Sequence, residues 1–583
     1  MPEKSEAMRA AGSNQTVADR IAAAFARHGV EIAFGQSLPS AFHLAAPAFG
    51  IRQAAYRAEN AGGAMADGYA RISNRVAVVT AQNGPAATLL VAPFAEALKV
   101  SIPVVGLVQE VPAANADRNA FQELDHFRLF DGVTKWVRRI DRADRVDDYV
   151  DMAFQAAASG RPGPVVLLAP ADLLEFPAPG SPDRRGASLG RFPLDRVQAA
   201  PDRVEAAADL LAGARAPLVV VGGGIHISRA CAEIAALQED HSLPVATTVM
   251  GKGAVDENHP LSLGVVGYFM ADGSRTRDLR DMVTEADLIF FVGARTNQNA
   301  TDSWTLYPEG ATYIHLDIDS MEVGRNYEAH RLVGDARLTL RALHDALGRR
   351  DTGARKAARP AIEAKIAKAV SNWRGQITRR FADAPSTPVR PEKLMLDIDT
   401  VLTPDSIVVA DASYSSIWIS NYLTARRAGQ RFVTPRGLAG LGWGLPLAIG
   451  AQFAEPDASV ITVVGDGGFA HCWAELEMLV RHELPIVTIV LNNQILGYQK
   501  HGETVLYSRY TDAVDFRPVD HAAIARACGV EGIRIADPEE FLPALKNAVT
   551  ARRPVLLDVL VDENAHPPIT AFGKTISDLF EQV

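Results

Sequence analysis

The sequence predicts an α/β protein with three doubly wound parallel-sheet domains. Short apolar runs rich in β-branched residues recur along the chain, amphipathic segments of helical length lie between them, and two polar stretches interrupt this alternation. Continuous apolar runs of this length are typical of strands that are buried on both faces of a parallel sheet. A chain of 583 residues is long enough to form three or four domains, each with its own core.

The expected strands fall into three groups along the chain. They span 76–80, 102–108 and 164–170, then 217–224, 287–294 and 313–319, and finally 406–413, 459–467, 485–493 and 554–562. Two stretches rich in Pro, Gly or charged residues, 175–195 and 348–365, are typical of linkers. The predicted domains are therefore 14–178, 196–348 and 390–565.

Composition narrows the class of protein. A net charge of −10 and a pI near 5.8 argue against a broad contact with nucleic acid, which needs a basic face. The three cysteines, Cys231, Cys472 and Cys528, are far apart in sequence, which favours buried thiols in a reducing compartment. No apolar signal core opens the chain, and no uncharged run approaches the ~20 residues of a membrane span. We expect a cytoplasmic protein that acts on small molecules, away from membranes.

Two turn-rich segments follow neighbouring strands of the last domain. Gly465 and Gly467 flank Asp466 after one apolar run, and Asn493 follows the next run, 493 − 466 = 27 positions later. Ligands of such sheets bind at the carboxyl ends of the strands. Backbone amides beside the glycines would approach an anion, while Asp466 and Asn493 would bind an octahedral Mg²⁺ that also holds a diphosphate. On these residues alone, two unrelated turns are the better interpretation, because Gly, Asp and Asn are common in turns.

Together with Ala-Glu-Leu-Glu at 474–477 and with Gly497, this stretch resembles the diphosphate and magnesium motif of thiamine-diphosphate enzymes. Further segments resemble acetohydroxyacid (acetolactate) synthases: AAYRAENAGGAMADGYAR (54–71), NAFQELDHFRLFDGVTKW (119–136), SGRPGPVVL (159–167) and GLAGLGWGLPLAIGAQFAEP (437–456). The resemblance implies an N-terminal domain for the cofactor's pyrimidine, a Rossmann-like middle domain and a C-terminal domain for its diphosphate. It also implies an active site between subunits, hence a homodimer at least and commonly a homotetramer.

The resemblance assigns the central catalytic role to Glu59. This residue matches the family glutamate that hydrogen-bonds to the pyrimidine ring, favouring the imino tautomer whose nitrogen removes the thiazolium proton. Burial beside an aromatic heterocycle raises the pKa of a carboxyl group and so favours proton sharing. Without the family, Glu59 reads as an ordinary helix carboxylate.

The remaining contacts to thiamine diphosphate also follow from the resemblance. Asp466, Asn493 and the backbone carbonyl of Ile495 match the Mg²⁺ ligands, whereas Tyr414, Ser415, Gly467 and Gly468 match groups that bind the diphosphate. The synthases often have histidine where Ser415 stands. Leu441 matches the apolar residue between the two cofactor rings, and the Ala439 carbonyl replaces that of a family glycine as acceptor for the exocyclic amine.

The sequence leaves open whether the middle domain binds a second cofactor. Its turns resemble those that hold FAD in the synthases, with Gly223, Gly224, Gly293, Arg295, Asp317 and Asp335 as contacts and Arg161 from the first domain. Relatives use this domain for FAD, ADP, CoA or no ligand, and Ala171 stands where the synthases usually have lysine. FAD binding, and with it the class of flavoprotein, therefore stays open. A bound FAD need not take part in redox chemistry.

The segments expected to line the substrate pocket differ from the synthase pattern at residues 35–40 and 81–88. Gly502 also falls near a position where the synthases have a tryptophan. Gln122 and Tyr498 are candidate catalytic residues. Gln36, Gln82, Asn83, Phe121 and Gln499 are further candidates for the substrate pocket. Packing or turn formation explains Gln122, Gln36, Gln82, Asn83 and Phe121 equally well. For His126 and His471, a surface or supporting position is favoured over a proton relay.

These expectations favour a thiamine-diphosphate- and Mg²⁺-dependent 2-oxo-acid decarboxylase and carboligase of acetolactate-synthase type, which transfers a carbanion-enamine to a second carbonyl. One alternative is a decarboxylase that releases an aldehyde without ligation. Another is a lyase that cleaves a 2-hydroxyacyl-CoA or a cyclic diketone. A noncatalytic nucleotide-binding subunit is also conceivable, but the presence of Glu59, Asp466 and Asn493 argues against it.

Overall fold

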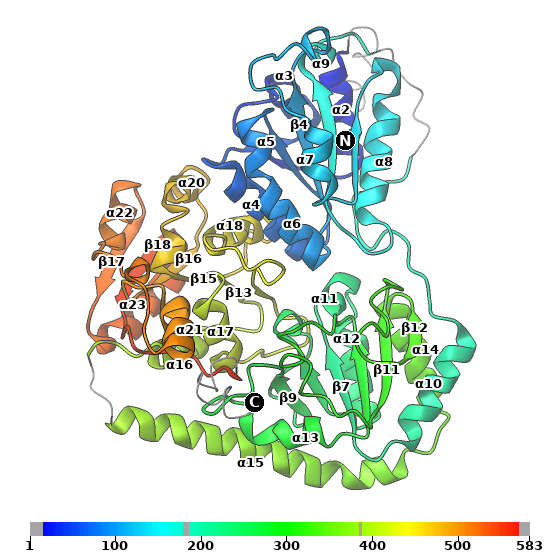
Figure 1. Ribbon diagram of the computed structural model, residues 1–583, viewed down its shortest axis with the longest axis vertical. Helices are drawn as coiled ribbons and strands as arrows, with labels where there is room; N and C mark the ends of the chain where they lie inside the picture. The colour runs from blue at the N-terminus through cyan, green and yellow to red at the C-terminus, as the bar shows by residue number, and fades with distance from the viewer. Residues whose placement is uncertain (1–14, 179–185, 384–386, 571–583) are drawn as a thin grey trace. The chain divides into compact units, whose positions relative to one another are not determined.

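The computed structural model describes residues 15–178, 186–383 and 387–570 (Figure 1). The chain forms two compact units. The first comprises residues 1–195, 435–457 and 474–484, and the second comprises 196–434, 458–473 and 485–583. Residue 14, where the first predicted domain begins, and residues 179–185 of the first predicted linker lie outside the described residues. The other domain boundaries stay predictions.

The first unit is built on a six-stranded parallel sheet with the order β2-β1-β3-β4-β6-β5. Its strands are β1 (Ile32–Phe34), β2 (Arg52–Ala54), β3 (Ala77–Ala81), β4 (Val104–Glu110), β5 (Trp136–Arg139) and β6 (Val165–Pro170). Its helices are α2 (Val17–Arg27), α3 (Ser40–Ala45), α4 (Glu59–Ser73), α5 (Pro85–Leu89), α6 (Val91–Val100), α7 (His126–Asp131), α8 (Val146–Ala158) and α9 (Ala171–Leu174). Two helices from far along the chain, α18 (Gly444–Ala454) and α20 (Leu476–Arg481), complete the unit.

The second unit contains two further six-stranded parallel sheets. The middle sheet has the order β12-β11-β10-β7-β8-β9. Its strands are β7 (Pro217–Val221), β8 (Val245–Thr247), β9 (Ser262–Val265), β10 (Leu288–Val292), β11 (Thr312–Asp317) and β12 (His330–Val333). The helices of this region are α10 (Pro201–Gly213), α11 (Gly224–Ser228), α12 (Cys231–Asp240), α13 (Arg280–Thr284), α14 (Ala336–Leu347) and α15 (Gly353–Asp383).

The C-terminal sheet of this unit has the order β14-β13-β15-β16-β18-β17. Its strands are β13 (Ile407–Ala410), β14 (Phe432–Val433), β15 (Val460–Gly465), β16 (Val487–Asn492), β17 (Glu531–Ile535) and β18 (Val555–Leu560). The accompanying helices are α16 (Pro391–Val401), α17 (Tyr414–Tyr422), α19 (Asp466–Phe469), α21 (Gly497–Tyr507), α22 (His521–Ala527) and α23 (Pro538–Ala551). The three sheets confirm the predicted α/β class.

The expected strands differ from the observed ones mainly at the sheet edges. The sequence did not indicate β2, β5, β9, β12, β14 or β17, which are the edge strands, nor the three-residue strands β1 and β8. Strands β2, β5, β12 and β17 are partly exposed and lack a continuous apolar run. Strands β1, β8, β9 and β14 are buried but are too short for such a run to stand out. The expected runs 217–224 and 287–294 instead extended too far, because β7 ends at Val221 and β10 ends at Val292, and the glycines beyond them form turns.

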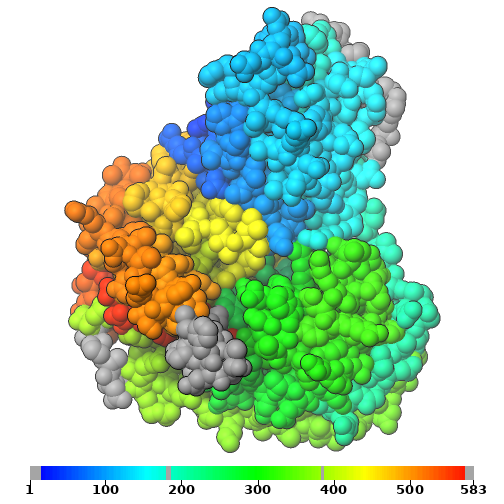
Figure 2. Space-filling view, in the orientation of Figure 1, coloured from blue at the N-terminus to red at the C-terminus, as the bar shows by residue number. Residues whose placement is uncertain are grey.

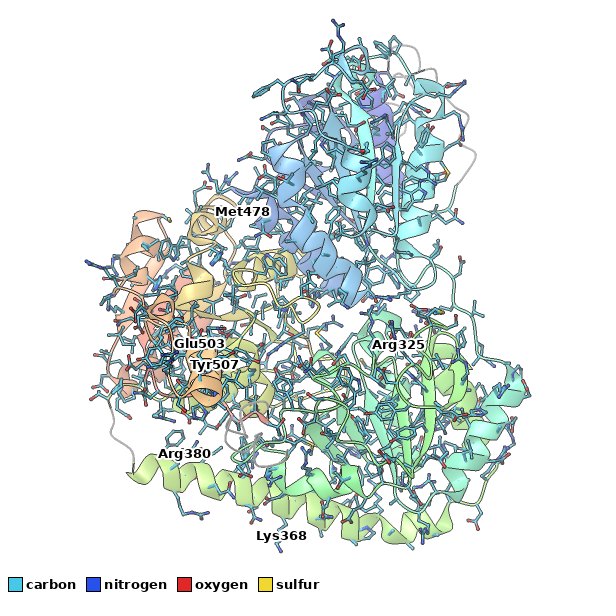
Figure 3. The ribbon with its side chains drawn as sticks, in the orientation of Figure 1. Arg325, Lys368, Arg380, Met478, Glu503 and Tyr507 are labelled. Atoms are coloured by element: carbon cyan, nitrogen blue, oxygen red, sulfur yellow. The ribbon has the colours of Figure 1, made fainter. Side chains whose placement is uncertain are left out.

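The second predicted linker is mostly helical. Residues 353–383 form α15, which Figure 1 shows as one continuous helix. Helix-forming Ala, Lys, Arg and Glu dominate its first half, and they outweigh the interruption by Pro360. The Trp373 indole donates to the Gly273 carbonyl at 3.2 Å, so the helix is packed on the unit. Lys368 is exposed, while Arg380 forms an ion pair with Glu392 at 3.3 Å (Figure 3).

The described cysteines form no disulfide within 15–178, 186–383 and 387–570, and burial raises the pKa of the Cys231 thiol to about 11. Cys472 is buried, as expected, whereas Cys231 and Cys528 are only partly buried, so the expectation of buried thiols is wrong for these two. Within those ranges no helix is long and apolar enough to cross a membrane.

Candidate active site

Glu59 opens helix α4, and a distant carboxylate fixes the start of that helix. The preceding residue, Ala58, provides no side-chain cap. Glu475 instead accepts the backbone N–H of Ala58 at 3.0 Å and that of Arg57 at 3.1 Å. Burial raises the pKa of Glu475, and these hydrogen bonds oppose that shift. The Glu59 side chain is half-buried, and none of the described residues hydrogen-bonds to its carboxylate, which is therefore free to meet a ligand.

The substrate candidates of the first unit meet in one cluster. The Gln82 amide donates to the Gln122 side-chain oxygen at 2.6 Å, and the Asn83 amide donates to the Gln122 backbone carbonyl at 3.0 Å. Gln122 has a φ of +63°, a strained conformation for a residue with a side chain. The neighbouring Phe121 is 86% exposed. The structure thus brings Gln82, Asn83 and Gln122 together, while Gln36 is an exposed residue whose amide lies 3.4 Å from the Arg57 carbonyl.

His126 lies beneath this cluster and supports it. The side chain is 2% exposed, so its position is not on the surface. Its Nε2 accepts the backbone N–H of Gly84 at 3.2 Å, and its Nδ1 lies 3.3 Å from Glu110 Oε1. Because Nε2 accepts, Nδ1 carries the proton and donates to Glu110. His126 therefore fixes the turn at Gly84, which has a φ of +62°. His471, the other candidate histidine, is exposed.

The C-terminal sheet brings Asp466 and Asn493 together, as the sequence predicted. Asp466 follows β15 and Asn493 follows β16, and these strands are paired in parallel with Gly465 opposite Leu491. The Asp466 carboxylate is 5% exposed and accepts the Gln494 N–H at 2.9 Å. Burial raises the pKa of Asp466 to about 6. A buried carboxylate without a paired cation favours a metal ion, which would restore the charge balance.

Three groups converge at this corner with the spacing of metal ligands. One end of the Asn493 amide lies 3.1 Å from Asp466 Oδ1 and 2.9 Å from the Ile495 carbonyl oxygen. With nitrogen at this end, both contacts are hydrogen bonds; with oxygen there, three oxygens meet. Adjacent oxygens around octahedral Mg²⁺ are about 3.0 Å apart, because each lies about 2.1 Å from the ion. These residues therefore fit Mg²⁺. Among the described residues, no group of three or more His, Cys, Asp or Glu side chains could hold a metal ion.

A tyrosine and a histidine adjoin this corner. Tyr414 begins α17, and its hydroxyl lies 2.8 Å from His501 Nδ1 on α21. The Tyr498 ring packs edge-on against Tyr414 at 5.7 Å, and the His566 ring lies 4.0 Å from His501. Burial lowers the pKa of His501 to about 4, so the ring is neutral near pH 7. Helix α21, orange in Figure 2, lies on the face shown there, and Figure 3 labels its Glu503 and Tyr507.

The sequence indicated Tyr414 and Tyr498 but missed His501. Its only local signal is the spacing from Tyr498, 501 − 498 = 3 positions, which places both on one face of a helix. Ser415 is buried beside them, and its hydroxyl is the nearest atom, at 3.8 Å, to the position where a side chain on Gly465 would begin. A methyl group there would make one ordinary van der Waals contact and no clash. Gln499, by contrast, donates to Glu503 at 2.8 Å on the exposed side of α21.

The glycines of the middle sheet are used for backbone packing. A side chain at Gly222 would meet the Gly293 carbonyl oxygen at 2.3 Å, and one at Gly224 would meet the Gly293 Cα at 2.7 Å. One at Gly223 would meet Met250 at 3.3 Å. Because neighbouring turns already occupy this space, the glycines require no bound nucleotide.

The other residues expected to bind FAD are engaged within the protein. Asp335 accepts from Ser228 Oγ at 2.7 Å and from Arg196, and it caps helix α14. Asp317 accepts the Asp319 N–H at 2.9 Å, and Arg295 lies 3.8 Å from Glu322. In the first unit, Arg161 donates to Ser101 and to the Leu98 carbonyl, each at 2.9 Å. The chain's own contacts thus explain these residues, and the fit to FAD does not follow from them.

Three family models match successive parts of the chain. Residues 15–129 match the N-terminal TPP binding domain of thiamine pyrophosphate enzymes, 204–343 match their central domain, and 411–559 match their C-terminal TPP binding domain. The chain belongs to the thiamine-diphosphate enzyme family. It is therefore an enzyme that depends on this cofactor, and the resemblance inferred from its motifs is confirmed.

Curated relatives extend this similarity over most of the chain. It is 31% identical over 548 residues to a probable acetolactate synthase large subunit of Methanocaldococcus jannaschii, covering 90% of this chain and 88% of the relative. It is 33% identical over 566 residues to the acetolactate synthase large subunit of Parasynechococcus marenigrum, covering 94% and 88%. With the large subunit of acetolactate synthase isozyme 2 of Escherichia coli it shares 29% identity over 537 residues, covering 92% and 93%.

Proposed function

We propose that this enzyme is a 2-oxo-acid decarboxylase and carboligase of acetolactate-synthase type. It removes CO₂ from a 2-oxo acid and joins the remaining acyl unit to a second carbonyl compound. The observation that carries this proposal is the similarity to acetolactate synthases over about nine tenths of the chain, in a protein that retains Glu59, Asp466 and Asn493. The products are hydroxy-keto compounds.

Asp466, Asn493 and the Ile495 carbonyl are proposed to bind Mg²⁺, because their mutual spacing suits adjacent octahedral ligands. Diphosphate oxygens and water would complete the coordination. Tyr414, Ser415 and the backbone of Gly467 and Gly468 are proposed to bind the diphosphate. The hydroxyls would donate to it, since a phosphate oxygen only accepts hydrogen bonds. Tyr414 is held in place by His501.

Thiamine diphosphate supplies, when bound, a nucleophilic carbon and an acceptor for the electrons released on decarboxylation. Glu59 is proposed to hold a proton against the pyrimidine ring, and Glu475 keeps the start of α4 in place for that task. The Ala439 carbonyl is proposed to accept a hydrogen bond from the cofactor's exocyclic amine, and the Leu441 side chain is proposed to pack against the cofactor. Gln122 and Tyr498 are proposed to orient the substrates; Gln122 is held by Gln82 and Asn83.

Three further expectations do not affect the proposed reaction. FAD in the middle domain, a homodimer or homotetramer, and a cytoplasmic location are expectations from the family. No step depends on FAD, because the residues assigned to it are engaged in contacts within the chain. The name "large subunit", carried by several relatives, supports a test for a partner subunit as well as for self-association.

The proposal is tested by mass-spectrometric product analysis. The purified protein is incubated with thiamine diphosphate, Mg²⁺ and a panel of 2-oxo acids, with and without aldehyde acceptors, beside a Glu59→Gln control. A C–C bonded product that requires Glu59 is the expected result. Release of aldehyde alone would replace the proposal with a non-ligating decarboxylase. Turnover only of a 2-hydroxyacyl-CoA or a cyclic diketone would replace it with a lyase.

A further inference from the structure

The loop between Gly437 and Trp443 joins strand β14 to helix α18 and carries Ala439 and Leu441. Ala439 has a φ of +61°, in the left-handed region that residues with side chains rarely adopt. A conformation of this kind persists only when surrounding contacts impose it. The groups that hold this loop therefore decide where the Ala439 carbonyl and the Leu441 side chain lie.

Glu96 holds the first part of the loop. This residue lies on α6, its side chain is 2% exposed, and it is the only acid in the sequence VAPFAEALKV of that helix. Glu96 Oε1 accepts the N–H of Gly437 at 2.8 Å, and Oε2 accepts the N–H of Leu438 at 2.5 Å. A side chain at Gly437 would meet both Glu96 Oε2 and Lys99 Cβ at 2.9 Å, so the carboxylate lies directly against the backbone.

A buried ion network on α4 supports the Glu96 carboxylate. Arg71 Nη2 lies 3.5 Å from Glu96 Oε1, and the same guanidinium donates to Asp67 at 2.5 and 2.9 Å. All three side chains are nearly inaccessible to solvent. A buried carboxylate is tolerated when its charge is paired and its oxygens accept hydrogen bonds, and Glu96 meets both conditions.

The other end of the loop is held by the same helix. The Trp443 indole donates to Asn60 Oδ1 at 2.8 Å, and Asn60 lies in the first turn of α4. Helix α18 then packs on α4, where a side chain at Gly68 would meet the Leu447 carbonyl oxygen at 2.2 Å. Hydrogen bonds thus hold the loop on both sides of Ala439–Leu441, from Glu96 before this segment and from Asn60 after it.

We propose that Glu96 is a positioning residue for thiamine diphosphate: by accepting two consecutive N–H groups, it sets the loop that presents Ala439 and Leu441 to the cofactor. The inference rests on the proposed roles of Ala439 and Leu441. A carboxylate is required because both of its oxygens must accept, and an ionised carboxylate has no hydrogen to offer. A glutamine would turn an N–H₂ group toward one of the two backbone donors.

The test compares Glu96→Gln with Asp151→Asn. Asp151 lies in the same unit, is 6% exposed, and accepts hydrogen bonds from Arg27 and His28. Both variants should lower the Tm of the cofactor-free protein by similar amounts. Calorimetric titration with thiamine diphosphate at saturating Mg²⁺ should show at least tenfold weaker binding for Glu96→Gln and a change below twofold for Asp151→Asn. The KM for the 2-oxo acid should stay within twofold of the parent in both.

An unchanged cofactor Kd in Glu96→Gln, or an equal loss in Asp151→Asn, overturns the inference. If Glu96→Gln does not fold, Glu96→Asp keeps the charge opposite Arg71 but shortens the reach by one methylene, and the same tenfold loss is expected. Failure of the parent protein to bind thiamine diphosphate would reject the proposed function itself. Normal binding by the parent and by both Glu96 variants would reject only the role of Glu96.

Discussion

The middle and C-terminal sheets of the second unit both end in glycine-rich turns, and the surroundings of Gly222 and Gly224 at the middle sheet differ from those of Gly465 at the C-terminal sheet. At the middle sheet, Gly222 and Gly224 face the backbone of Gly293, and a side chain on either would lie within 2.7 Å of it. At the C-terminal sheet, the nearest atom to a side chain on Gly465 is 3.8 Å away. The next residue along the chain, Asp466, has a buried carboxylate.

This difference shows why a glycine-rich turn alone is weak evidence for a nucleotide or diphosphate site. Glycine is needed wherever two backbones approach closely and equally where a backbone approaches a ligand. The two cases separate only when the structure shows what fills the space. In this protein, backbone fills the space beside Gly222 and Gly224, and the side chains of Phe516 and Leu496 approach Gly467, whereas a methyl group on Gly465 would meet only the Ser415 hydroxyl, at ordinary contact distance.

The largest expected effect comes from Asp466→Ala. It removes the only charged group among the proposed Mg²⁺ ligands, so affinity for thiamine diphosphate in the presence of Mg²⁺ should fall at least about 100-fold, or about 2.7 kcal/mol. Isothermal titration calorimetry measures this loss. Asp335→Ala, at the middle sheet, is the matched control and should leave cofactor affinity within about twofold while lowering stability. Equal losses of affinity in the two variants would show that the C-terminal sheet has no special role in binding the cofactor.

Gly222→Ala should mainly affect stability. The added methyl group would meet the Gly293 carbonyl oxygen at 2.3 Å, and backbone atoms there move only together with the turn. Overpacking of this kind costs about 1–3 kcal/mol, and each kcal/mol corresponds to a fall in Tm of about 2–4 °C. Differential scanning calorimetry without cofactor measures the change. An unchanged Tm would show that the middle turns are looser than the contacts indicate.

Gly465→Ala should have the opposite profile. Gly465 has φ −83° and ψ 151°, a conformation open to any residue, and its side-chain space is free. The Tm of the cofactor-free protein should therefore change by less than about 1 °C. Affinity for thiamine diphosphate should fall about tenfold, or about 1.4 kcal/mol, because the methyl group enters the space proposed for the diphosphate. Unchanged affinity would place the diphosphate elsewhere.

The smallest effect is expected for His501→Phe. This change removes the hydrogen bond to the Tyr414 hydroxyl and keeps an aromatic ring beside His566. A hydrogen bond of this kind contributes about 0.5–1.5 kcal/mol, so the activation constant for thiamine diphosphate should rise about two- to tenfold. His344→Phe, on α14 of the middle region, is the control. A loss in the control as large as that in His501→Phe would contradict a specific role at the C-terminal edge.

The sequence predicted the elements that depend on local patterns. Buried strands appear as apolar runs, and Asp466 and Asn493 follow two such strands, so their meeting at one edge follows from parallel pairing. Edge strands such as β14 and β17 lack this pattern. The helical nature of 353–365 was also missed, because a charged, Pro-containing helix resembles a linker until its packing is known.

Contacts between distant segments could not be predicted. Glu475 caps the start of α4 although it lies 475 − 58 = 417 positions from Ala58, and Glu96 holds a loop more than 300 residues away along the chain. His126 was expected on the surface or in support, and the structure places it beneath the Gly84 turn. No periodicity or spacing links such partners, since only the fold brings them together.

Equilibrium binding of thiamine diphosphate to the purified protein, measured with Mg²⁺ and separately with a chelator, tests most directly whether the metal holds the cofactor. One cofactor per chain is expected with Mg²⁺, and affinity should fall at least about 100-fold, or about 2.7 kcal/mol, when the metal is removed. The Asp466→Ala variant should show weak binding under both conditions. Binding of equal strength with and without the metal, or with and without Asp466, would contradict a cofactor held through Mg²⁺ at the C-terminal sheet.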